Sequence, residues 1–392
     1  MSTAVKAHGL DGALVEPDWA PLGFKEVRAL LSQFPECGEA VLILSASPRP
    51  FSAASVVATR GGRVFIKRQH RSVRDREGML EEHRFLDHLR AHGAAVPRVL
   101  ANALGETAIE IGEWTYEVHE APPGLDLYAD ALSWTPFRTP AHAHSAGRAL
   151  AQMHEAARGF DATRRRPRPL VASFTIFAAN NPAAELEHYL AARPVLAAHA
   201  GVREHAEEAL AQLAPFHAEL RPLLPALRPL WTHNDLHASN LLWSDAGPDA
   251  ETATIIDFGL CDRANAVHDL AHAIERNMVE WLALVEDPAH AEDVPVHFDH
   301  LQPLLDGYES VRPLRKEEAA ALSPMTALCH AEFALSEADY FLGVLRSGER
   351  AAMAYDGWLV GHARWFRSSA GKRLLDALRR WAAVRKPLES NE

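Results

Sequence analysis

The chain has 392 residues, of which 48% are hydrophobic and 23% charged, as is typical of a globular protein with a sizeable core. Its net charge of −12 disfavours a general nucleic-acid-binding protein and favours a cationic or neutral substrate over a polyanion. Three widely spaced cysteines argue against a disulfide framework, and residues 1–17 lack the apolar core of a signal peptide. No apolar run is long enough to span a membrane, so we expect a cytoplasmic protein.

The first 120 residues predict an antiparallel sheet with one helix inserted after its third strand. Helical spacing occurs at residues 22–34 and 78–93, and strand-like runs occur at 40–47, 52–60, 63–70, 96–102 and 107–121. The Gly61-Gly62 pair between the second and third runs indicates a hairpin.

Beyond a Pro/Gly-containing segment at residues 121–128, the chain is mostly helical. Helical patterns cover residues 145–160, 183–228, 265–286, 314–346 and 353–384. Two short strands interrupt them. We therefore expect an α+β fold with an N-terminal lobe of residues 1–120 and a helical lobe of residues 121–392.

The stretch "WTHNDLHASNLLW", residues 231–243, and the stretch "ATIIDFG", residues 253–259, each place an acid just after an apolar strand. Asn240 and Asp257 offer an amide and a carboxylate oxygen, the hard ligands that Mg²⁺ takes beside nucleotide phosphates. Asp235 lies earlier on the same loop as Asn240, where it can orient an acceptor hydroxyl and accept its proton. We expect His233 to hold this loop rather than to react, and Asp269 to stabilise either the start of its helix or this loop.

A lysine for the nucleotide phosphates is offered by Lys67, which follows the apolar run "VFI". An acid to hold this lysine lies on the helix of residues 78–93. Both Glu82 and Glu81 fit that position by spacing.

Five motifs of the chain are, in chain order, "VFIK", "AVPRVL", "HNDLHASN", "IIDFG" and "VHDLA". In these motifs and in their order, the chain resembles the aminoglycoside phosphotransferase and choline kinase superfamily. This is the small-molecule branch of the protein-kinase-like fold. The resemblance covers about residues 41–281 and implies a two-lobed enzyme that uses ATP and Mg²⁺. It implies that Asp235 is the catalytic base, that Asn240 and Asp257 are metal ligands, and that Lys67 pairs with Glu82.

The resemblance also implies a nucleotide-binding hinge and loop. The hinge would hold adenine through the backbone around Glu117 to His119. A glycine-rich loop is absent, so the phosphate-covering loop is assigned by position to the stretch that contains Ser52 and Ser55.

Several alternatives belong to other classes of protein. No long activation segment follows "DFG", which favours a small-molecule kinase over a protein Ser/Thr kinase of the same fold. A nucleotide-binding pseudokinase would lack the base, metal ligands or lysine, all of which are present. A zinc hydrolase is the most distant alternative, through His268 and His272 at helical spacing with Glu275 beside them.

The acceptor is expected to bind among the C-terminal helices. Acidic and aromatic candidates for holding an amine are Glu275, Glu280, Glu332, Glu337, Asp339 and Tyr340. With the negative net charge, they favour an amino alcohol, a hydroxy amino acid or an aminosugar, and neither nucleic acid nor membrane as partner. The pattern is equally compatible with ATP and GTP and with any oligomeric state, and antibiotic resistance does not follow from it.

Overall fold

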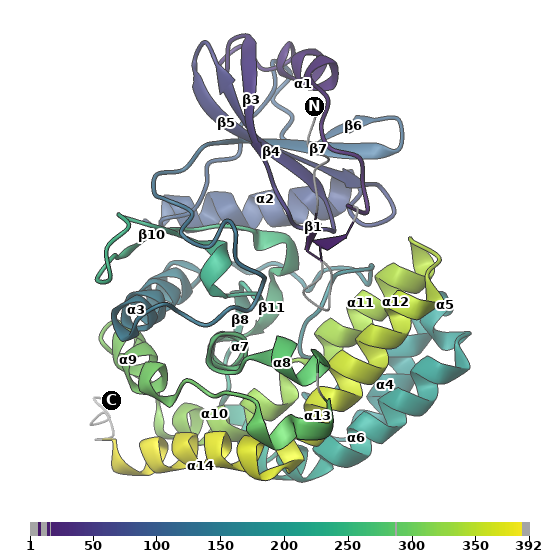
Figure 1. Ribbon diagram of the computed structural model, residues 1–392, viewed down its shortest axis with the longest axis vertical. Coiled ribbons are helices and arrows are strands. Elements are labelled where there is room, and N and C mark those ends of the chain that lie inside the picture. The colour runs from purple at the N-terminus through teal and green to yellow at the C-terminus, as the bar shows by residue number, and fades with distance from the viewer. Residues whose placement is uncertain (1–6, 9–13, 16, 287, 386–392) are drawn as a thin grey trace.

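The computed structural model describes residues 7–8, 14–15, 17–286 and 288–385 (Figure 1). The prediction about a signal peptide rests largely on residues outside these ranges. Among the helices that are described, none is both long and apolar enough to cross a membrane.

The N-terminal half of the cleft is built on a five-stranded antiparallel sheet, seen at the top of Figure 1. Its strands, in spatial order, are β3 (Ala40–Ala46), β4 (Ala53–Thr59), β5 (Gly62–His70), β7 (Trp114–Glu120) and β6 (Ile109–Ile111). Helix α2 (Arg76–Ala91) follows β5 and lies beneath the sheet, and α1 (Phe24–Leu31) precedes it. The predicted α+β class and the sheet with one inserted helix are confirmed.

The β4–β5 hairpin forms where the glycine pair predicts it, because Thr59 pairs directly with Gly62. Gly62 has φ of +140°, a conformation that side chains other than hydrogen rarely allow. The strand predicted at residues 96–102 is wrong. This segment makes a single bridge, from Val99 to His119, flanked by hydrogen bonds from Leu100 N to Val118 O and from Glu120 N to Arg98 O.

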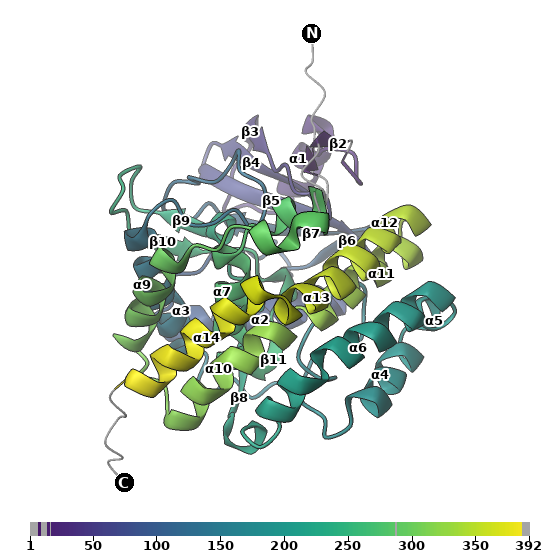
Figure 2. The same cartoon turned by 60° about the horizontal axis from the view of Figure 1, so that its bottom comes forward.

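The remainder of the chain is mainly helical. Its long helices are α3 (Pro140–Ala156), α4 (Pro182–Ala191), α6 (Ala200–Leu220), α7 (Ala266–Met278), α9 (Phe298–Glu309), α10 (Lys316–Leu328), α11 (Ala331–Gly343) and α14 (Ser369–Val384). Shorter segments are β1 (Ala7–His8), β2 (Leu14–Val15), α5 (Pro194–Ala197), α8 (Trp281–Glu286), α12 (Gly348–Ala352), α13 (His362–Arg367), the π-helical turn η5 (Met353–Gly361), and the 3-10 turns η1 (Leu224–Ala226), η2 (Ala238–Asn240), η3 (Phe258–Leu260) and η4 (Pro288–Asp293). Figure 2 shows α4 to α6 packed beside α11 to α13.

Two short antiparallel ribbons lie between the sheet and the helices. In one, β8 (Pro229–Thr232) pairs with β11 (Asp262–Asn265), and in the other, β9 (Leu241–Trp243) pairs with β10 (Thr252–Ile255). The loops at 233–240 and 256–261 each cross from one ribbon to the other. They therefore run side by side, joined by the hydrogen bond from Ile256 N to Asn240 O, 2.9 Å.

Helix α7 forms the centre of the helical lobe and supports these loops from below. Every residue of α7 is buried, and Asn265 caps its first turn by accepting from His268 N at 3.0 Å. A helix buried on all sides is held rigidly by its neighbours. Its polar side chains can therefore fix the loops that they contact.

The segment before α1 connects the two halves of the molecule. Asp18 accepts hydrogen bonds from Tyr340 at 2.9 Å and from Arg350, on α11 and α12. Trp19 stacks on His70 of β5, with ring centroids 5.2 Å apart. This segment thus ties the sheet to the helices on one side of the cleft.

Candidate active site

One cleft lies between the sheet and the helices and collects the predicted catalytic residues. From the sheet side it is lined by Arg49, Pro50, Phe51, Ser52, Lys67, Gln69, Val73 and Arg74. From the helical side it is lined by Leu132, Ser133, Trp134, Leu170, Asp235, His237, Asn240, Asp257, Gly259, Leu260, Leu282, Phe333, Glu337 and Trp358.

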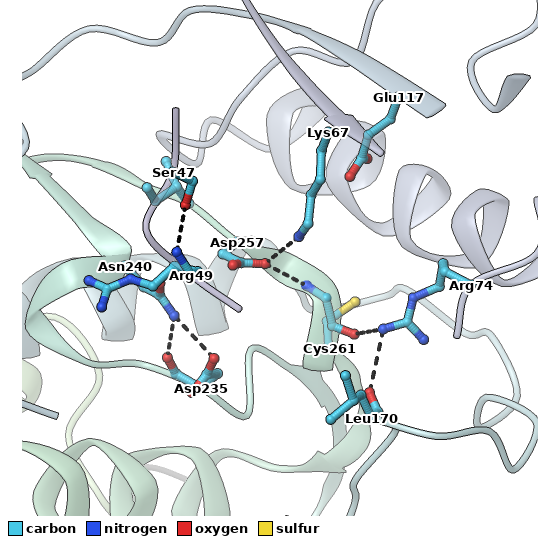
Figure 3. Close-up of polar contacts among 12 residues, drawn as sticks. Ser47, Arg49, Lys67, Arg74, Glu117, Leu170, Asp235, Asn240, Asp257 and Cys261 are labelled. Atoms are coloured by element: carbon cyan, nitrogen blue, oxygen red, sulfur yellow. Dashed lines mark hydrogen bonds and ion pairs between the residues drawn. The ribbon is translucent and has the colours of Figure 1, made fainter. Parts of the chain in front are cut away.

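Lys67 and Asp257 form an ion pair across the cleft (Figure 3). Lys67 Nζ donates to Asp257 Oδ1 at 2.8 Å, although the two residues are far apart in the chain. Burial alone would lower the pKa of Lys67, but the carboxylates of Asp257, Glu117 and Glu82 raise it above its ordinary value. Desolvation in the cleft likewise opposes ionisation of Asp257, and Lys67 more than offsets this, so that the pKa of Asp257 falls to about 2.

Asp257 follows β10 in a left-handed backbone conformation, with φ of +59°. Asn234, beside the predicted base, shares this conformation with φ of +62°. Asp and Asn tolerate the left-handed region better than most residues, and such conformations concentrate at functional sites. They turn each loop sharply at the point where its acid faces the cleft.

Asp235 and Asn240 face each other across their short loop (Figure 3). Asn240 Nδ2 donates to the Asp235 carbonyl at 2.9 Å and to Asp235 Oδ2 at 3.2 Å. Because the amide donates through nitrogen, its oxygen is the group that can coordinate a cation. An amide oxygen and the Asp257 carboxylate on adjoining loops are hard ligands, so this pair fits Mg²⁺.

Residues 233–240, called the catalytic loop below, are held by hydrogen bonds to a side chain of α7. The two oxygens of Asp269 accept from His233 N and Asn234 N, each at 2.8 Å, and Asp269 also lies 3.0 Å from His154 Nε2. His233 Nε2 lies 2.9 Å from the Ile256 carbonyl on the neighbouring loop. The expected anchoring roles of His233 and Asp269 are therefore confirmed.

Glu81 and Glu82, neighbours on α2, have different surroundings. Glu81 Oε2 lies 3.5 Å from both Arg165 Nε and Arg168 Nη1. Glu82 is buried, and its carboxylate is one of those that raise the pKa of Lys67. Glu81 is thus engaged with arginines, whereas Glu82 acts on Lys67 only through its charge, after Asp257 and Glu117, and the direct hydrogen bond of Lys67 goes to Asp257.

Glu117 and His119 lie inside β7, so the predicted hinge needs correction. Their strand is paired with β5 on one side, and on the other side Val118 O accepts from Leu100 N at 2.8 Å. A backbone engaged on both edges cannot serve as the hinge, and the connection between the lobes begins after Glu120. The Glu117 side chain instead lies 2.9 Å from His83 Nε2 and 2.8 Å from His119 Nε2.

The loop between β3 and β4 covers the cleft. Ser52 lines the cleft, whereas Ser55 is buried within β4 opposite Ile66. Phe51 packs edge-on against Tyr340 of α11, with centroids 5.2 Å apart. Of the two predicted serines, only Ser52 lines the cleft.

Residues 50–314 match the model of the phosphotransferase enzyme family. The chain belongs to this family. Its superfamily, its enzyme class and the action of a small-molecule phosphotransferase, as predicted from the sequence, are confirmed. Comparison with curated protein sequences gives no match.

Solved structures share the fold of this phosphotransferase at low sequence identity. A microcompartment-associated aminopropanol kinase is 18% identical with a TM-score of 0.55, covering 90% of this chain and 100% of its own. An amicoumacin kinase in complex with AMP-PNP, Ca²⁺ and Ami is 16% identical with a TM-score of 0.53, covering 87% and 93%. An aminoglycoside phosphotransferase with ADP and hygromycin B is 13% identical with a TM-score of 0.51, covering 87% and 98%.

Most of the acids predicted to bind an acceptor amine do not line the cleft of the phosphotransferase. Glu332 accepts from Thr175 Oγ1 at 2.9 Å and from Ile176 N at 2.7 Å, so it holds a loop. The other candidates are also engaged elsewhere: Glu275 with His362, Glu280 with His297, Asp339 with Arg193 and Tyr340 with Asp18. Of these predicted amine-binding residues, Glu337 alone lines the cleft.

Glu337 is buried among aromatic side chains, with 1% of its surface exposed. It lines the cleft together with Trp134, Phe333 and Trp358, and its Oε2 has no hydrogen-bond partner among the described residues. Burial raises the pKa of Glu337 to about 8, although nearby arginines act in the opposite direction. An unpaired carboxylate in an aromatic setting is suited to a cationic group.

The zinc-hydrolase alternative loses its proposed site. His268 and His272 are both buried, with ring centroids 4.6 Å apart. His272 lies with Glu275 and Cys329 in a group compact enough to hold a cation, but His268 is not part of any such group within the described ranges. None of these residues lines the cleft.

Three arginines of the site were missed from the sequence. Arg49 lines the cleft, Arg74 donates to the Gly259 carbonyl at 2.7 Å, and Arg276 pairs with Asp235. Arginine is common on protein surfaces, so none of them stood out. For Arg276 a signal existed, because it follows Asp269 by two helical turns and so shares its face of α7.

Proposed function

We propose that this phosphotransferase moves the γ-phosphate of ATP, with Mg²⁺, to a hydroxyl group of a small molecule that also carries an amine. Amino alcohols, hydroxy amino acids and aminosugars have this chemistry. The observation that carries the proposal is one cleft lined both by Lys67, Asp235, Asn240 and Asp257 and by Glu337, whose buried Oε2 has no hydrogen-bond partner among the described residues.

Asp235 is the proposed catalytic base. Its carboxylate faces the cleft on a loop fixed by Asn240 and by α7. In phosphoryl transfer the protein supplies mainly position and charge, because the reaction needs little covalent help. Asp235 would orient the acceptor hydroxyl toward the γ-phosphorus and take its proton as the new bond forms.

Asn240 and Asp257 would hold Mg²⁺ through their oxygens, and Lys67 would hold the nucleotide phosphates with Glu82 behind it. When bound, Mg²⁺ supplies neutralisation of the phosphate charge. Lys67 now donates to Asp257, so it already lies beside the proposed metal ligand. Solved relatives of this fold contain AMP-PNP with Ca²⁺ or ADP, which supports a nucleotide and a divalent cation here.

The nucleotide base is proposed to contact the connection after Glu120, and the loop containing Ser52 to cover the phosphates. We keep residues 1–120 and 121–392 as the proposed lobes on either side of this connection. The free backbone of a connecting segment can bond a base, whereas the strand before it is fully paired.

Glu337 is the proposed ligand of the acceptor amine. An ammonium group beside it would gain a charge-assisted hydrogen bond and would satisfy the buried Oε2. Trp134, Phe333 and Trp358 would surround the carbon skeleton. The kinases of similar fold are named for aminopropanol, amicoumacin and aminoglycosides, which supports amine-bearing acceptors.

The test is ADP release from Mg-ATP across a panel of amino alcohols, hydroxy amino acids, aminosugars and their uncharged analogues. We expect transfer to an amine-bearing alcohol, abolished by Asp235→Ala, and much weaker transfer to the analogue without the amine. ATP binding without transfer to any small molecule would overturn the proposed acceptor class and return attention to protein hydroxyls.

A further inference from the structure

Arg276 lies behind the proposed catalytic base. It is fully buried on α7, and its Nη1 forms an ion pair with Asp235 Oδ1. The other oxygen, Oδ2, accepts from Asn240 Nδ2 at 3.2 Å. The carboxylate of Asp235 is therefore held at both oxygens, one from its own loop and one from α7.

The guanidinium of Arg276 lies beside two aromatic rings and a second acid. Its carbon lies 4.5 Å from the centroid of Phe333 and 5.4 Å from that of Trp134, and its Nε lies 3.8 Å from Glu275 Oε2. Phe333 and Trp134 line the cleft, but Arg276 does not. An acceptor can therefore contact the aromatic rings without touching the arginine behind them.

Arg276 differs from the other α7 residues that hold the catalytic loop. Asp269 binds the backbone of His233 and Asn234, and Asn277 Oδ1 accepts from Ala238 N at 2.9 Å. These contacts fix the path of the loop. Arg276 reaches past the backbone to the reacting side chain, and removing it would leave the loop path intact while freeing the carboxylate to rotate.

We infer that Arg276 is a positioning residue, which sets the direction of the Asp235 carboxylate for phosphoryl transfer. This inference rests on the proposed function. In that reaction the acceptor oxygen bonds to the γ-phosphorus, the bond from phosphorus to the β,γ-bridging oxygen breaks, and ADP leaves with the electron pair. The acceptor proton passes to Asp235, and Arg276 keeps the receiving oxygens aimed at it without contacting either substrate.

A lysine cannot fully replace this arginine. The planar guanidinium can lie flat on Phe333 while its edge meets the carboxylate, whereas an ammonium is a compact charge without a flat face. Misplacing a catalytic group by about 1 Å can cost about a hundredfold in rate. The loss is expected in kcat, because Arg276 lines neither the nucleotide nor the acceptor part of the cleft.

The test compares Arg276→Met, Arg276→Lys and Arg276→Ala with the wild type. Arg193→Met is the matched control, because Arg193 is also buried, stacks on Tyr189 at 3.7 Å and lies outside the cleft lining. We expect kcat to fall about a hundredfold in Arg276→Met and less in Arg276→Lys, with KM for ATP changed by less than about threefold. KM for the acceptor does not judge the inference, because Arg276 packs on Phe333 and its charge opposes the raised pKa of Glu337. Guanidinium chloride should restore kcat of Arg276→Ala at least about tenfold, while sodium chloride at equal concentration should not.

A crystal structure of Arg276→Met gives a readout that does not require activity. We expect the Asp235 carboxylate to rotate away from its wild-type direction. An unchanged carboxylate, wild-type kcat in a folded Arg276→Met, or a drop in kcat equal to that of Arg193→Met would each overturn the inference.

If the methionine variant fails to fold, Arg276→Lys with wild-type kcat and no guanidinium rescue of Arg276→Ala would overturn it too. A wild type that phosphorylates nothing in the panel would overturn the proposed function, and the position of Asp235 in the variant would still decide the role of Arg276.

Discussion

The two ends of the cleft treat their polar groups in opposite ways. At the catalytic end, Lys67 bonds Asp257, and Asn240 and Arg276 hold the two oxygens of Asp235. At the acceptor end, Glu337 lies among aromatic rings with Oε2 unpaired. Buried guanidinium nitrogens of Arg74 and Arg276 also lack hydrogen-bond partners within the described part of the chain, so the contrast concerns the acids. Asp235 and Asp257 each accept a hydrogen bond before any substrate arrives, whereas Oε2 of Glu337 has a bond left to make.

This difference separates rate from recognition. A catalytic group that is already oriented loses no energy to reorganisation during the reaction, so the catalytic end should control kcat. A buried polar atom without a partner costs about 1–3 kcal/mol, and a ligand that satisfies it recovers that energy on binding. The acceptor end should therefore control KM. Each variant below tests this division, beginning with the largest expected effect.

Asp235→Asn should give the largest loss. The amide keeps the shape of the side chain but cannot take the acceptor proton, so kcat should fall by about 100- to 10,000-fold. Mg-ATP affinity, measured by calorimetry, should stay within a few fold of the wild type. Near-normal turnover in this variant would remove Asp235 from the chemistry and end the division between the two ends.

Asp257→Ala should lower kcat by about a hundredfold or more, because Lys67 loses its partner and Mg²⁺ loses a proposed ligand. The Mg²⁺ concentration for half-maximal rate should also rise, measured by titrating the metal at saturating ATP. Asp161→Ala, at an acid that is largely exposed, is the control and should change neither value. An unchanged Mg²⁺ requirement in Asp257→Ala would exclude it as a metal ligand.

The catalytic end could be predicted from sequence because its information is local. Asp235 and Asp257 follow apolar strands and Asn240 directly precedes one, and a strand end fixes where the adjoining side chains lie. The acceptor end depends on helix rotation. Glu332 and Glu337 lie on the same helix, but one holds a loop and the other faces the cleft, as decided by how α11 packs.

Contacts between residues far apart in the chain could likewise not be predicted from the spacing of residues in the sequence. Arg276 is far from Asp235 along the chain, and only the packing of α7 under the loop joins them. The hinge was misplaced for a related reason. The resemblance placed the hinge at Glu117 to His119, but these residues pair with β5, and that ladder continues to Glu120.

Glu337→Gln should raise KM for an amine-bearing acceptor by about 10- to 100-fold, which corresponds to one charge-assisted hydrogen bond. KM for ATP should be unchanged, and kcat should change little, since the structure shows no hydrogen bond or ion pair between the described side chains of Glu337 and Asp235. Glu280→Gln is the control, because Glu280 pairs with His297 outside the cleft lining. A loss that falls equally on ATP and acceptor would contradict the role of Glu337 in recognition.

The smallest effect should appear in stability without substrate. Burial raises the pKa of Glu337 to about 8 from an ordinary value of 4.5. Between these values the folded protein keeps a proton that the unfolded chain releases, so the contribution of Glu337 to the free energy of unfolding falls as pH rises.

Glu337→Gln carries no titrating group and escapes this loss. The Tm of the variant minus that of the wild type should therefore increase by a few degrees between pH 5 and pH 9. An amine-bearing acceptor should shrink this difference at pH 9, because its ammonium stabilises the ionised Glu337 of the wild type alone. A Tm difference that is the same at both pH values would show that Glu337 is already satisfied without a ligand, and the contrast between the two ends of the cleft would disappear.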